Sequence, residues 1–443
     1  MNRILITISI VTVSLFSSGQ EELSLAQAIA TGLQNNFQIR IANLNVEIAS
    51  NNNSIGSAGA LPTLDLSINN QNLYDNSGTP GFSNGVASIT ESESTINNLK
   101  PSLTLNWVLF SGYRIRTSID NFAQLQKLTE GNAALVVENT VQSIILAYYQ
   151  SQLETEKLNI VVKLKDLSKD RYNYLLTKKE LGSAVTYDVL QAKNAFLTDS
   201  SNVLLQEMNL RTSMMNLNQL LGESAGKQYV ISDEFPVYQE EYKLLELIGK
   251  LDENNKTLQN QYINQKILRN STKLAKSKMY PTISMRAGTD VGKNWIKAMD
   301  YDRVDYDNFD YYAAFALSWN LYNGGNTRSD IQNARIEEEI ASLQVDEMKN
   351  SLTILVSTMY DFYNARKQLY KVAEENMKSS ELNLQLSSER FKAGTINSFN
   401  FRDVQIMYMN ASFNKLEAIY NLIDTHTELL RLTGGIIEEY ENK

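Results

Sequence analysis

The sequence predicts a mainly α-helical fold with membrane β-strands, built from two structural repeats. The chain has 443 residues but only five prolines and 20 glycines, so few turns interrupt its elements. Very long helical segments alternate with short strand-like segments, and the second half of the chain repeats this order. The mean hydropathy of −0.31 excludes a bundle of membrane helices.

The first 20 residues have the pattern of a secretory signal peptide. Arg3 precedes an apolar run at 4–16, and small residues follow it, as a cleavage site requires. We expect the mature chain to start near Gln20 or Glu21, and the alternative is an uncleaved anchor. Beyond this segment no apolar run reaches about 18 residues. An exported chain of this kind is either soluble or held in an outer membrane by β-strands.

The chain repeats itself once, which predicts its domain organisation. The Pro-Thr segments at Pro62 and Pro281 resemble each other, and the offset between matched residues is constant at 212 from Trp107 and Trp319 onward. The predicted parts are the signal peptide 1–20, a first repeat 21–222, a linker 223–240, a second repeat 241–434 and a C-terminal tail 435–443.

Each repeat is predicted to contain a leading, a long and a returning helix. The predicted helices are 24–57, 112–181 and 183–221 in the first repeat, and 241–278, 323–393 and 395–433 in the second. A long helix of about 70 residues spans about 105 Å. A leading and a returning helix placed end to end match that length, which predicts a long antiparallel helical cylinder. The apolar stripe from Met348 to Phe362 has coiled-coil spacing, and we interpret it as core packing.

Two alternating strands are predicted between the leading and the long helix of each repeat. Residues 63–69 and 102–107 alternate apolar and polar side chains, as do their counterparts 283–287 and 313–320. Each run has about 9–11 residues, the length of a tilted membrane strand. The polar face suits a wet interior, with Asp65, Asn106, Arg286 and Asn320. The strand ends nearest the helices carry a predicted aromatic girdle of Trp107, Phe110, Trp319 and Tyr322.

Four strands cannot close a transmembrane barrel, since about eight is the smallest number known. An open sheet edge in lipid leaves backbone groups unpaired, so several chains would have to share one barrel. The alternative is a small soluble sheet that caps a helical bundle.

The segments 75–98 and 292–310 are polar, and we expect solvated outer loops there. The second contains five aspartates that could suggest a calcium site, Asp300, Asp302, Asp305, Asp307 and Asp310. Their order does not follow the EF-hand pattern, so a solvated loop is the favoured interpretation.

Composition argues against an enzyme. The chain has no cysteine, which excludes thiol catalysis and zinc-thiolate sites. Its single histidine, His426, lies on a polar stretch where we expect a solvated helix residue. We predict no catalytic residue, no metal site and no cofactor. The net charge of −9 disfavours a nucleic-acid partner.

Taken together, these segments resemble the TolC-type outer-membrane efflux proteins. The resemblance covers essentially the whole mature chain. It rests on the opening LSLAQAIATGLQNNFQI at 23–39, the two Pro-Thr strand starts, the strand exits Phe110-Ser-Gly112 and Tyr322-Asn-Gly324, and the two glycine turns at Gly182 and Gly394. The order, spacing and duplication of these features carry the specificity, because no single motif is decisive.

The resemblance implies an outer-membrane exit duct of a tripartite efflux or type I secretion system. The family forms a homotrimer in which three chains of four strands give one 12-stranded β-barrel, and twelve helical strands form a periplasmic α-barrel. It opens when a periplasmic adaptor (a membrane fusion protein) and an inner-membrane transporter dock. The alternatives are a periplasmic coiled-coil scaffold or adaptor without a pore, and, less favoured, a hydrolase or metal enzyme.

The resemblance also implies roles for residues at the two helical turns. The family's adaptor-contact tips match Leu181, Gly182, Ser183, Ala393, Gly394 and Thr395. A glycine at each turn is equally consistent with an ordinary helix C-cap. Acidic residues that narrow the family's pore match Asp188 and Asp403, and Asn400 stands where an acidic residue is often found. The pair Arg171-Tyr172 lies seven residues too early to match the residues that precede the family's tip.

Overall fold

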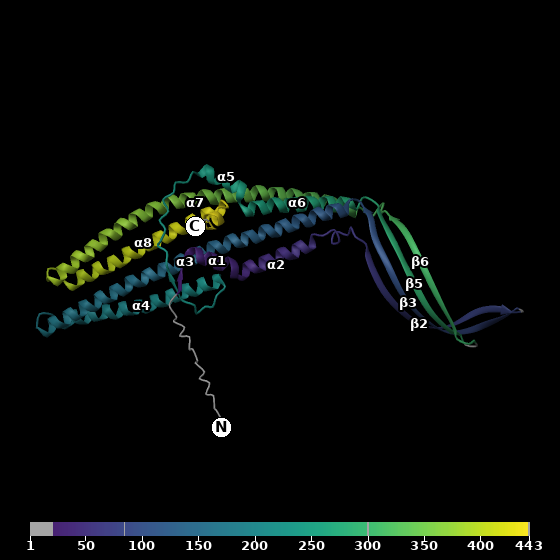
Figure 1. Cartoon of the computed structure of the whole chain (residues 1–443), viewed down its shortest axis with the longest axis horizontal. Coiled ribbons are helices and arrows are strands. Elements are labelled where there is room, and N and C mark those ends of the chain that lie inside the picture. The colour runs from purple at the N-terminus through teal and green to yellow at the C-terminus, as the bar shows by residue number, and fades with distance from the viewer. Residues whose placement is uncertain (1–20, 84, 299–300, 442–443) are drawn as a thin grey trace, which may run out of the picture. The chain divides into compact units, whose positions relative to one another are not determined.

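The computed structural model describes residues 21–441, apart from residues 84 and 299–300. The predicted signal peptide therefore lies outside the described residues. Two helices of 67 residues dominate the chain, α3 (Arg114–Glu180) and α7 (Asn326–Lys392) (Figure 1). At 1.5 Å per residue each is about 100 Å long. The fold class predicted from the sequence, mainly helical with a few strands, is confirmed.

The remaining elements follow the predicted repeated order. The first half has β1 (Glu21–Leu23), α1 (Leu25–Asn35), α2 (Phe37–Asn52), β2 (Thr63–Ser83), β3 (Val86–Ser111) and α4 (Thr186–Leu221), with α3 before α4. The second half has β4 (Tyr229–Ile231), α5 (Leu244–Asn254), α6 (Lys256–Ser277), β5 (Thr282–Ala298), β6 (Val304–Ser318), α8 (Ser398–Leu432) and α9 (Ile436–Glu441), with α7 before α8. Among the described helices, none is both long and apolar enough to cross a membrane.

The chain divides into two compact units. Within the described residues, the helical unit comprises 21–41, 135–255 and 351–441, and the sheet unit comprises 42–134 and 256–350. The long helices α3 and α7 contribute residues to both units. The candidate turns lie in the helical unit and the four long strands lie in the sheet unit.

The long strands form one antiparallel sheet in the order β2-β3-β5-β6. Thr63 pairs with Asn106, and Met285 pairs with both Trp107 and Phe315. The outer edges of the sheet are therefore β2 and β6.

The predicted strand lengths and polar loops were wrong. The strands have 21, 26, 17 and 15 residues, and strand pairing runs through most of 75–98 and 292–310. The polar composition misled the prediction, because a strand ladder is held by backbone hydrogen bonds that need no apolar side chain. In the second segment Asp305 pairs with Arg303 at 2.6 Å. No group of three or more acidic or histidine side chains that could hold a metal occurs among the described residues.

The leading helices were also predicted wrongly as single helices, because an asparagine breaks each one. Asn36 separates α1 from α2, and Asn255 separates α5 from α6; both have extended backbone. The Nδ2 of Asn36 donates to the carbonyl of Leu220 at 2.8 Å, and the Nδ2 of Asn255 donates to that of Leu432 at 2.9 Å. Each asparagine thus donates a hydrogen bond to a carbonyl at the C-terminal end of a returning helix. That returning helix has no further N–H group of its own to donate to this carbonyl.

The segment between the repeats folds onto the helices. Its strand β4 pairs in parallel with β1, and the hydroxyl oxygen of Tyr148 lies 2.8 Å from Asp233 Oδ2 and 2.9 Å from the carbonyl oxygen of Leu23, two acceptors that share its single proton. The expectation of a solvated His426 was wrong. Its side chain is 2% exposed and its ring stacks on Tyr238 at 3.7 Å, because this segment covers α8 there.

Four helices of the helical unit lie in the order α4-α3-α8-α7 (Figure 1). Gln206 of α4 donates to the carbonyl of Glu154 on α3 at 3.0 Å. Lys157 of α3 pairs with Glu417 of α8 at 2.8 Å. Arg366 of α7 donates to the carbonyl of Asn421 on α8. The two outer helices of this row are α4 and α7.

Candidate functional site

The two long helices end in the same turn. Gly182 and Gly394 have φ of 76° and 74°, the left-handed region that favours glycine. At each turn the residue after the glycine, Ser183 or Thr395, donates its N–H to a carbonyl five residues back, at 2.7 and 2.9 Å. Its side-chain hydroxyl donates to the same carbonyl at 3.0 Å. This 6→1 bond is the Schellman motif, which satisfies carbonyls left open at a helix end.

Both turns are open to solvent. A Cβ added at either glycine would meet nothing within 4 Å, so only the backbone conformation requires glycine there. The structure brings all six predicted tip residues into the two turns, each of them exposed, and Leu181 is 78% exposed. The turns therefore present exposed backbone, several small side chains and the exposed apolar side chain of Leu181.

An aromatic cluster behind the turns joins the two hairpins. Phe391 stacks on Phe401 with ring centroids 4.9 Å apart, and Tyr174 meets the edge of Phe391 at 5.2 Å. Nearer the turns, Tyr187 of α4 lies 6.3 Å from Phe399 of α8. Each of these two residues follows its turn glycine by five positions, so the two turns lie at the same level.

A buried ion pair also joins the hairpins. Arg402 of α8 donates two parallel hydrogen bonds to the carboxylate of Asp199 on α4, at 2.6 and 2.7 Å. Ser168 of α3 donates to the same carboxylate and accepts from Arg402 at 3.1 Å. Asp199 is 1% exposed, so the bidentate geometry compensates a fully desolvated charge.

Sequence reasoning missed this ion pair. The signal that could have found Asp199 is its place in the buried stripe of α4, where Ala192, Val203 and Leu217 are its apolar companions. A carboxylate at such a position needs a cation from another helix.

Arg171 lies beside the ion pair and not at the first turn. It is 3% exposed, and its Nη1 donates to the carbonyl of Ser398 at 3.0 Å, so it contacts the second hairpin. Burial, and after it the neighbouring Arg402, lower the pKa of Arg171 to about 10, while Asp199 acts in the opposite direction. Arg171 therefore contacts the second hairpin in the interior and is not exposed at the first turn.

The residues predicted to narrow a pore lie in the first turn of α4 and in the first two turns of α8. Asp188 follows Gly182 by six positions and is half-buried, while Asn400 follows Gly394 by six positions and is exposed. Asp403 lies one turn further along α8 and is also exposed. Asn400 and Asp403 are three residues apart and share one face of α8.

The predicted aromatic girdle residues occupy equivalent places in the sheet unit. The indole of Trp107 donates to the carbonyl of Ala60 at 2.9 Å, and that of Trp319 donates to the carbonyl of Met279 at 3.0 Å. Phe110 is half-buried, whereas Tyr322 is 84% exposed. Each tryptophan thus fixes the turn that enters the first long strand of its repeat, β2 or β5, and keeps part of its ring exposed.

The sequence and the fold both match known outer-membrane channels. A family model described as "Outer membrane efflux protein" matches residues 28–223 and 247–435. Nodulation protein T of Rhizobium leguminosarum bv. viciae is 22% identical over 447 residues, which cover 96% of this chain and 85% of that protein. Outer membrane protein TolC of Vibrio cholerae is 22% identical over 73% of this chain and 74% of its own length.

Among solved structures, the Campylobacter jejuni CmeC outer membrane channel has the same fold. Its TM-score is 0.76 at 14% identity, over 94% of this chain and 89% of that chain. The family match covers both repeats, including both turns and all four long strands. The chain belongs to the outer membrane efflux protein family.

Proposed function

We propose that this chain is the exit duct of a tripartite efflux or type I secretion system, a passive conduit across the periplasm and the outer membrane. In this proposal three copies form the duct, and a periplasmic adaptor and an inner-membrane transporter open it by docking. The energy comes from the transporter, so the duct needs neither a catalytic centre nor a cofactor.

The observation that carries the proposal is the sheet with two free edges. Within the described residues, β2 pairs with β3 and β6 pairs with β5, and neither has a second partner strand. A strand edge exposed to lipid would leave its backbone N–H and C=O groups without hydrogen-bond partners. Each unpaired group costs several kcal/mol of free energy. Joining β2 of one copy to β6 of the next removes every edge, and three copies give twelve strands.

The two faces of the sheet support a membrane location. Leu64, Leu66 and Ile68 alternate along β2 and are 64%, 72% and 66% exposed. The opposite face is polar, and Asn106 donates there to Asp65 at 3.2 Å. An apolar outer face and a polar inner face are what a water-filled membrane barrel requires.

The predicted residue roles belong to the same proposal. The six tip residues would contact the adaptor, and Asp188, Asn400 and Asp403 would narrow the pore near the turns. The four girdle residues would lie at the membrane interface, where amphipathic aromatic side chains are favoured.

Electron microscopy of the protein purified from outer membranes in mild detergent tests the proposal. We expect hollow threefold particles with a helical part of about 100 Å. Compact monomers that are extracted without detergent would contradict the proposal and favour a periplasmic scaffold.

A further inference from the structure

A wide groove opens where the sheet passes into the long helix of the second repeat. It lies within the sheet unit and has a volume of about 960 Å³. Its walls come from the two residues after α6, the loop after β6 and the first turns of α7. We call it the junction groove. Sites for small molecules have volumes of about 300–1,000 Å³, so the groove is large enough for the headgroup region of a lipid.

One side of the junction groove continues the apolar face of the sheet. Phe315, Leu317 and Trp319 occupy alternate positions at the end of β6 and just beyond it, and they are 70%, 66% and 54% exposed. Leu321 and Tyr322 line the groove next to Trp319 and are 78% and 84% exposed. In the proposed duct this end of the sheet lies at the periplasmic surface of the outer membrane, where hydrocarbon gives way to phosphate headgroups and water.

The other side of the junction groove is positively charged. Arg328 and Arg335 are seven residues apart on one face of α7, with Ile331 between them, and all three line the groove. Both arginine side chains are exposed, and within the part of the chain that the structure describes neither guanidinium makes an ion pair or a hydrogen bond. Lys278 also lines the groove, but its Nζ pairs with Asp330 at 2.8 Å. Two uncompensated cations therefore lie beside an apolar surface.

Hydrogen bonds hold the walls of the junction groove in place. The Nδ2 of Asn323 donates to Thr327 Oγ1 at 2.9 Å, and the backbone N–H of Thr327 donates to Asn323 Oδ1 at 3.3 Å. The indole of Trp319 donates to the carbonyl of Met279, on the wall after α6. The groove is thus formed before any ligand enters, which lowers the entropy cost of binding.

From this arrangement we propose that the junction groove binds one anionic glycerophospholipid of the periplasmic leaflet. The lipid phosphate pairs with Arg328 and Arg335, because planar guanidinium groups match the oxygens of a phosphate. The glycerol and the first acyl carbons lie against Trp319 and Leu321. The inference rests on the proposed function, because a barrel in the outer membrane is what brings lipid to this level of the chain.

The first repeat carries a smaller groove at the equivalent place, with a volume of about 320 Å³. Three lining positions of the two grooves are related by the offset of 212: Trp107 and Trp319, Arg116 and Arg328, and Ile119 and Ile331. Ala123 takes the place of Arg335, so among the described residues that line the first groove Arg116 is the only cation. A tryptophan and an arginine thus recur together at both junctions, and the second groove has the stronger attraction for an anion.

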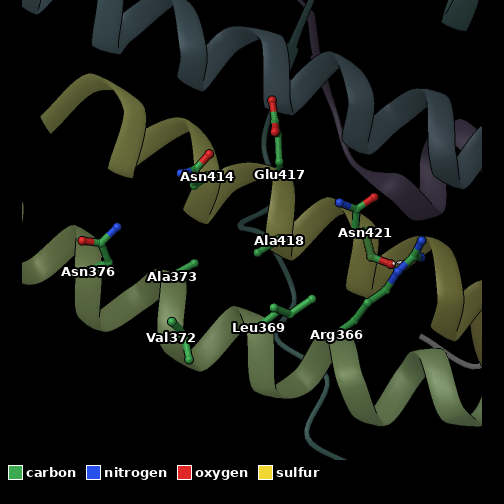
Figure 2. A pocket seen from close by; sticks show the side chains of 9 residues that line it. All are labelled: Arg366, Leu369, Val372, Ala373, Asn376, Asn414, Glu417, Ala418 and Asn421. Atoms are coloured by element: carbon green, nitrogen blue, oxygen red, sulfur yellow. Dashed lines mark hydrogen bonds between the residues drawn. The ribbon is translucent and has the colours of Figure 1, made fainter. Parts of the chain in front are cut away.

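A groove in the helical unit, between α7 and α8, lacks this combination (Figure 2). Its volume is about 410 Å³, and among the described residues that line it Arg366 is the only cation. That guanidinium already donates to the carbonyl of Asn421 at 2.6 Å and to Asp424 at 3.0 Å. Glu417 adds a negative charge to the same lining. An anionic lipid would therefore find no uncompensated cation there, unlike in the junction groove.

Lipid binding to the full-length protein, purified in mild detergent and stripped of lipid, tests the proposal. The probes are phosphatidylglycerol, phosphatidylcholine with the same acyl chains, and inorganic phosphate, and native mass spectrometry measures how many molecules of each are bound. We expect phosphatidylglycerol to bind at least about ten-fold more tightly than phosphatidylcholine, because each cation near an anionic lipid contributes about a five-fold change. Inorganic phosphate should bind more weakly than phosphatidylglycerol, because it has no apolar part to lie against Trp319.

Variants of the arginines test which groove is responsible. Arg328→Gln with Arg335→Gln should weaken phosphatidylglycerol binding at least about ten-fold and leave phosphatidylcholine binding unchanged. Arg303→Gln is the matched control, an exposed arginine at the opposite end of β6, about 50 Å away along the strand, and it should keep the natural preference. Arg116→Gln should have a smaller effect than the double variant.

The outcomes separate this inference from the proposed function, because the same spectra give the mass of the assembly. Trimers that bind the two lipids equally, or whose preference survives in the double variant, would overturn the lipid site and leave the duct proposal standing. Inorganic phosphate that binds as tightly as phosphatidylglycerol would overturn a lipid as the occupant. Monomers that keep the preference would overturn the duct and support the lipid site.

Fluorescence quenching in vesicles provides a second test without detergent. The chain has three tryptophans, so Trp107→Phe with Trp295→Phe leaves Trp319 as the single reporter. Lipids brominated on the acyl chain quench an indole that they contact. We expect brominated phosphatidylglycerol to quench Trp319 at least about two-fold more than brominated phosphatidylcholine at the same mole fraction, since the arginines concentrate anionic lipid there. Addition of Arg328→Gln and Arg335→Gln should remove the difference, and equal quenching with both arginines present would overturn the site.

Discussion

At the residue scale, Arg402 and Asp199 hold three helices together beneath the turns. The Asp199 carboxylate is buried, its ion pair with the half-buried Arg402 is bidentate, and Ser168 hydrogen-bonds to both. Arg402 is adjacent to Asp403 in the sequence but points to a different side of α8, since successive helical residues are 100° apart. A residue that holds helices together, Arg402, and a candidate pore residue, Asp403, therefore occupy neighbouring positions.

We predict that Arg402→Ala destabilises the protein by about 3–5 kcal/mol, because it leaves the Asp199 carboxylate unpaired in the interior. Thermal unfolding in detergent, followed by circular dichroism, measures the change. Replacing both partners, as Arg402→Met with Asp199→Leu, should recover most of the loss. Arg390→Ala, an exposed change at the second turn, is the control and should stay within about 0.5 kcal/mol. Equal melting temperatures for Arg402→Ala and Arg390→Ala would contradict a stabilising role of the Arg402–Asp199 ion pair.

Because of Tyr148, we expect the free energy of unfolding to decrease as the pH rises into the alkaline range. Burial raises the pKa of Tyr148, and Asp233 raises it further. The folded state therefore favours the neutral phenol, and this contribution is complete below the ordinary tyrosine pKa of about 10. As pH rises above that value the unfolded chain loses the proton first, so stability falls.

Accordingly, Tyr148→Phe should lose less stability between pH 9 and pH 11 than the natural chain, although it is less stable at neutral pH. Urea midpoints at the two pH values measure this slope. Tyr187→Phe, at a 65% exposed position, is the control and should keep the natural slope. An unchanged slope in Tyr148→Phe would exclude this tyrosine as the source.

At the element scale, each repeat ends its returning helix in the same way. Gly222 follows α4 and Gly434 lies just after α8, and they have φ of 70° and 73°. A Cβ at Gly222 would lie 2.6 Å from the carbonyl oxygen of Asn35, and one at Gly434 would lie 2.7 Å from the Cβ of Asn254. Each glycine thus makes room for the end of a leading helix, beside the asparagine that breaks it.

Gly434→Ala should therefore be more destabilising than Gly394→Ala, although the two backbones are alike. Gly394→Ala adds only the strain of a left-handed residue, about 1–2 kcal/mol, because nothing lies within 4 Å of the new Cβ. Gly434→Ala adds steric overlap with Asn254 to the same strain. Denaturant midpoints of the two variants make the comparison. Equal midpoints would mean that the end of α5 moves away from the new Cβ at no cost in free energy.

At the scale of the whole molecule, membership of the outer membrane efflux protein family places the chain in the outer membrane with its helical part in the periplasm. The predicted location and family are confirmed. The known members are channel proteins, which agrees with a conduit that has no catalytic role of its own.

In a threefold duct, Asp403 would form a ring of three carboxylates that favours cations. A unit charge at about 4 Å changes an ion's energy by about 1 kcal/mol in water, which is a several-fold change in permeability ratio. We expect Asp403→Ala to lower cation selectivity and Asn400→Asp to raise it. Reversal potentials across a planar bilayer under a potassium chloride gradient measure both. Unchanged potentials in both variants would place these residues away from the ion path.

The sequence determined the features that repeat or have a period. The duplicated Pro-Thr, tryptophan and glycine positions gave the order of elements, and the helical spacing of apolar residues gave two helices close to 70 residues long. These signals are local, because they depend on propensity, turn chemistry and the face that each residue occupies. They were sufficient for the fold class and for the position of both turns.

The tertiary structure decided the features that depend on distant partners. Asn36 breaks its helix because a carbonyl 184 residues away accepts its side chain, and His426 is buried because the segment between the repeats covers it. Asp199 pairs with Arg402, which is 203 residues away in the sequence. The strands continue through polar segments because a neighbouring strand supplies the hydrogen bonds. A single sequence shows what each residue can do locally, whereas the free energy of burial and pairing depends on which groups the fold brings together.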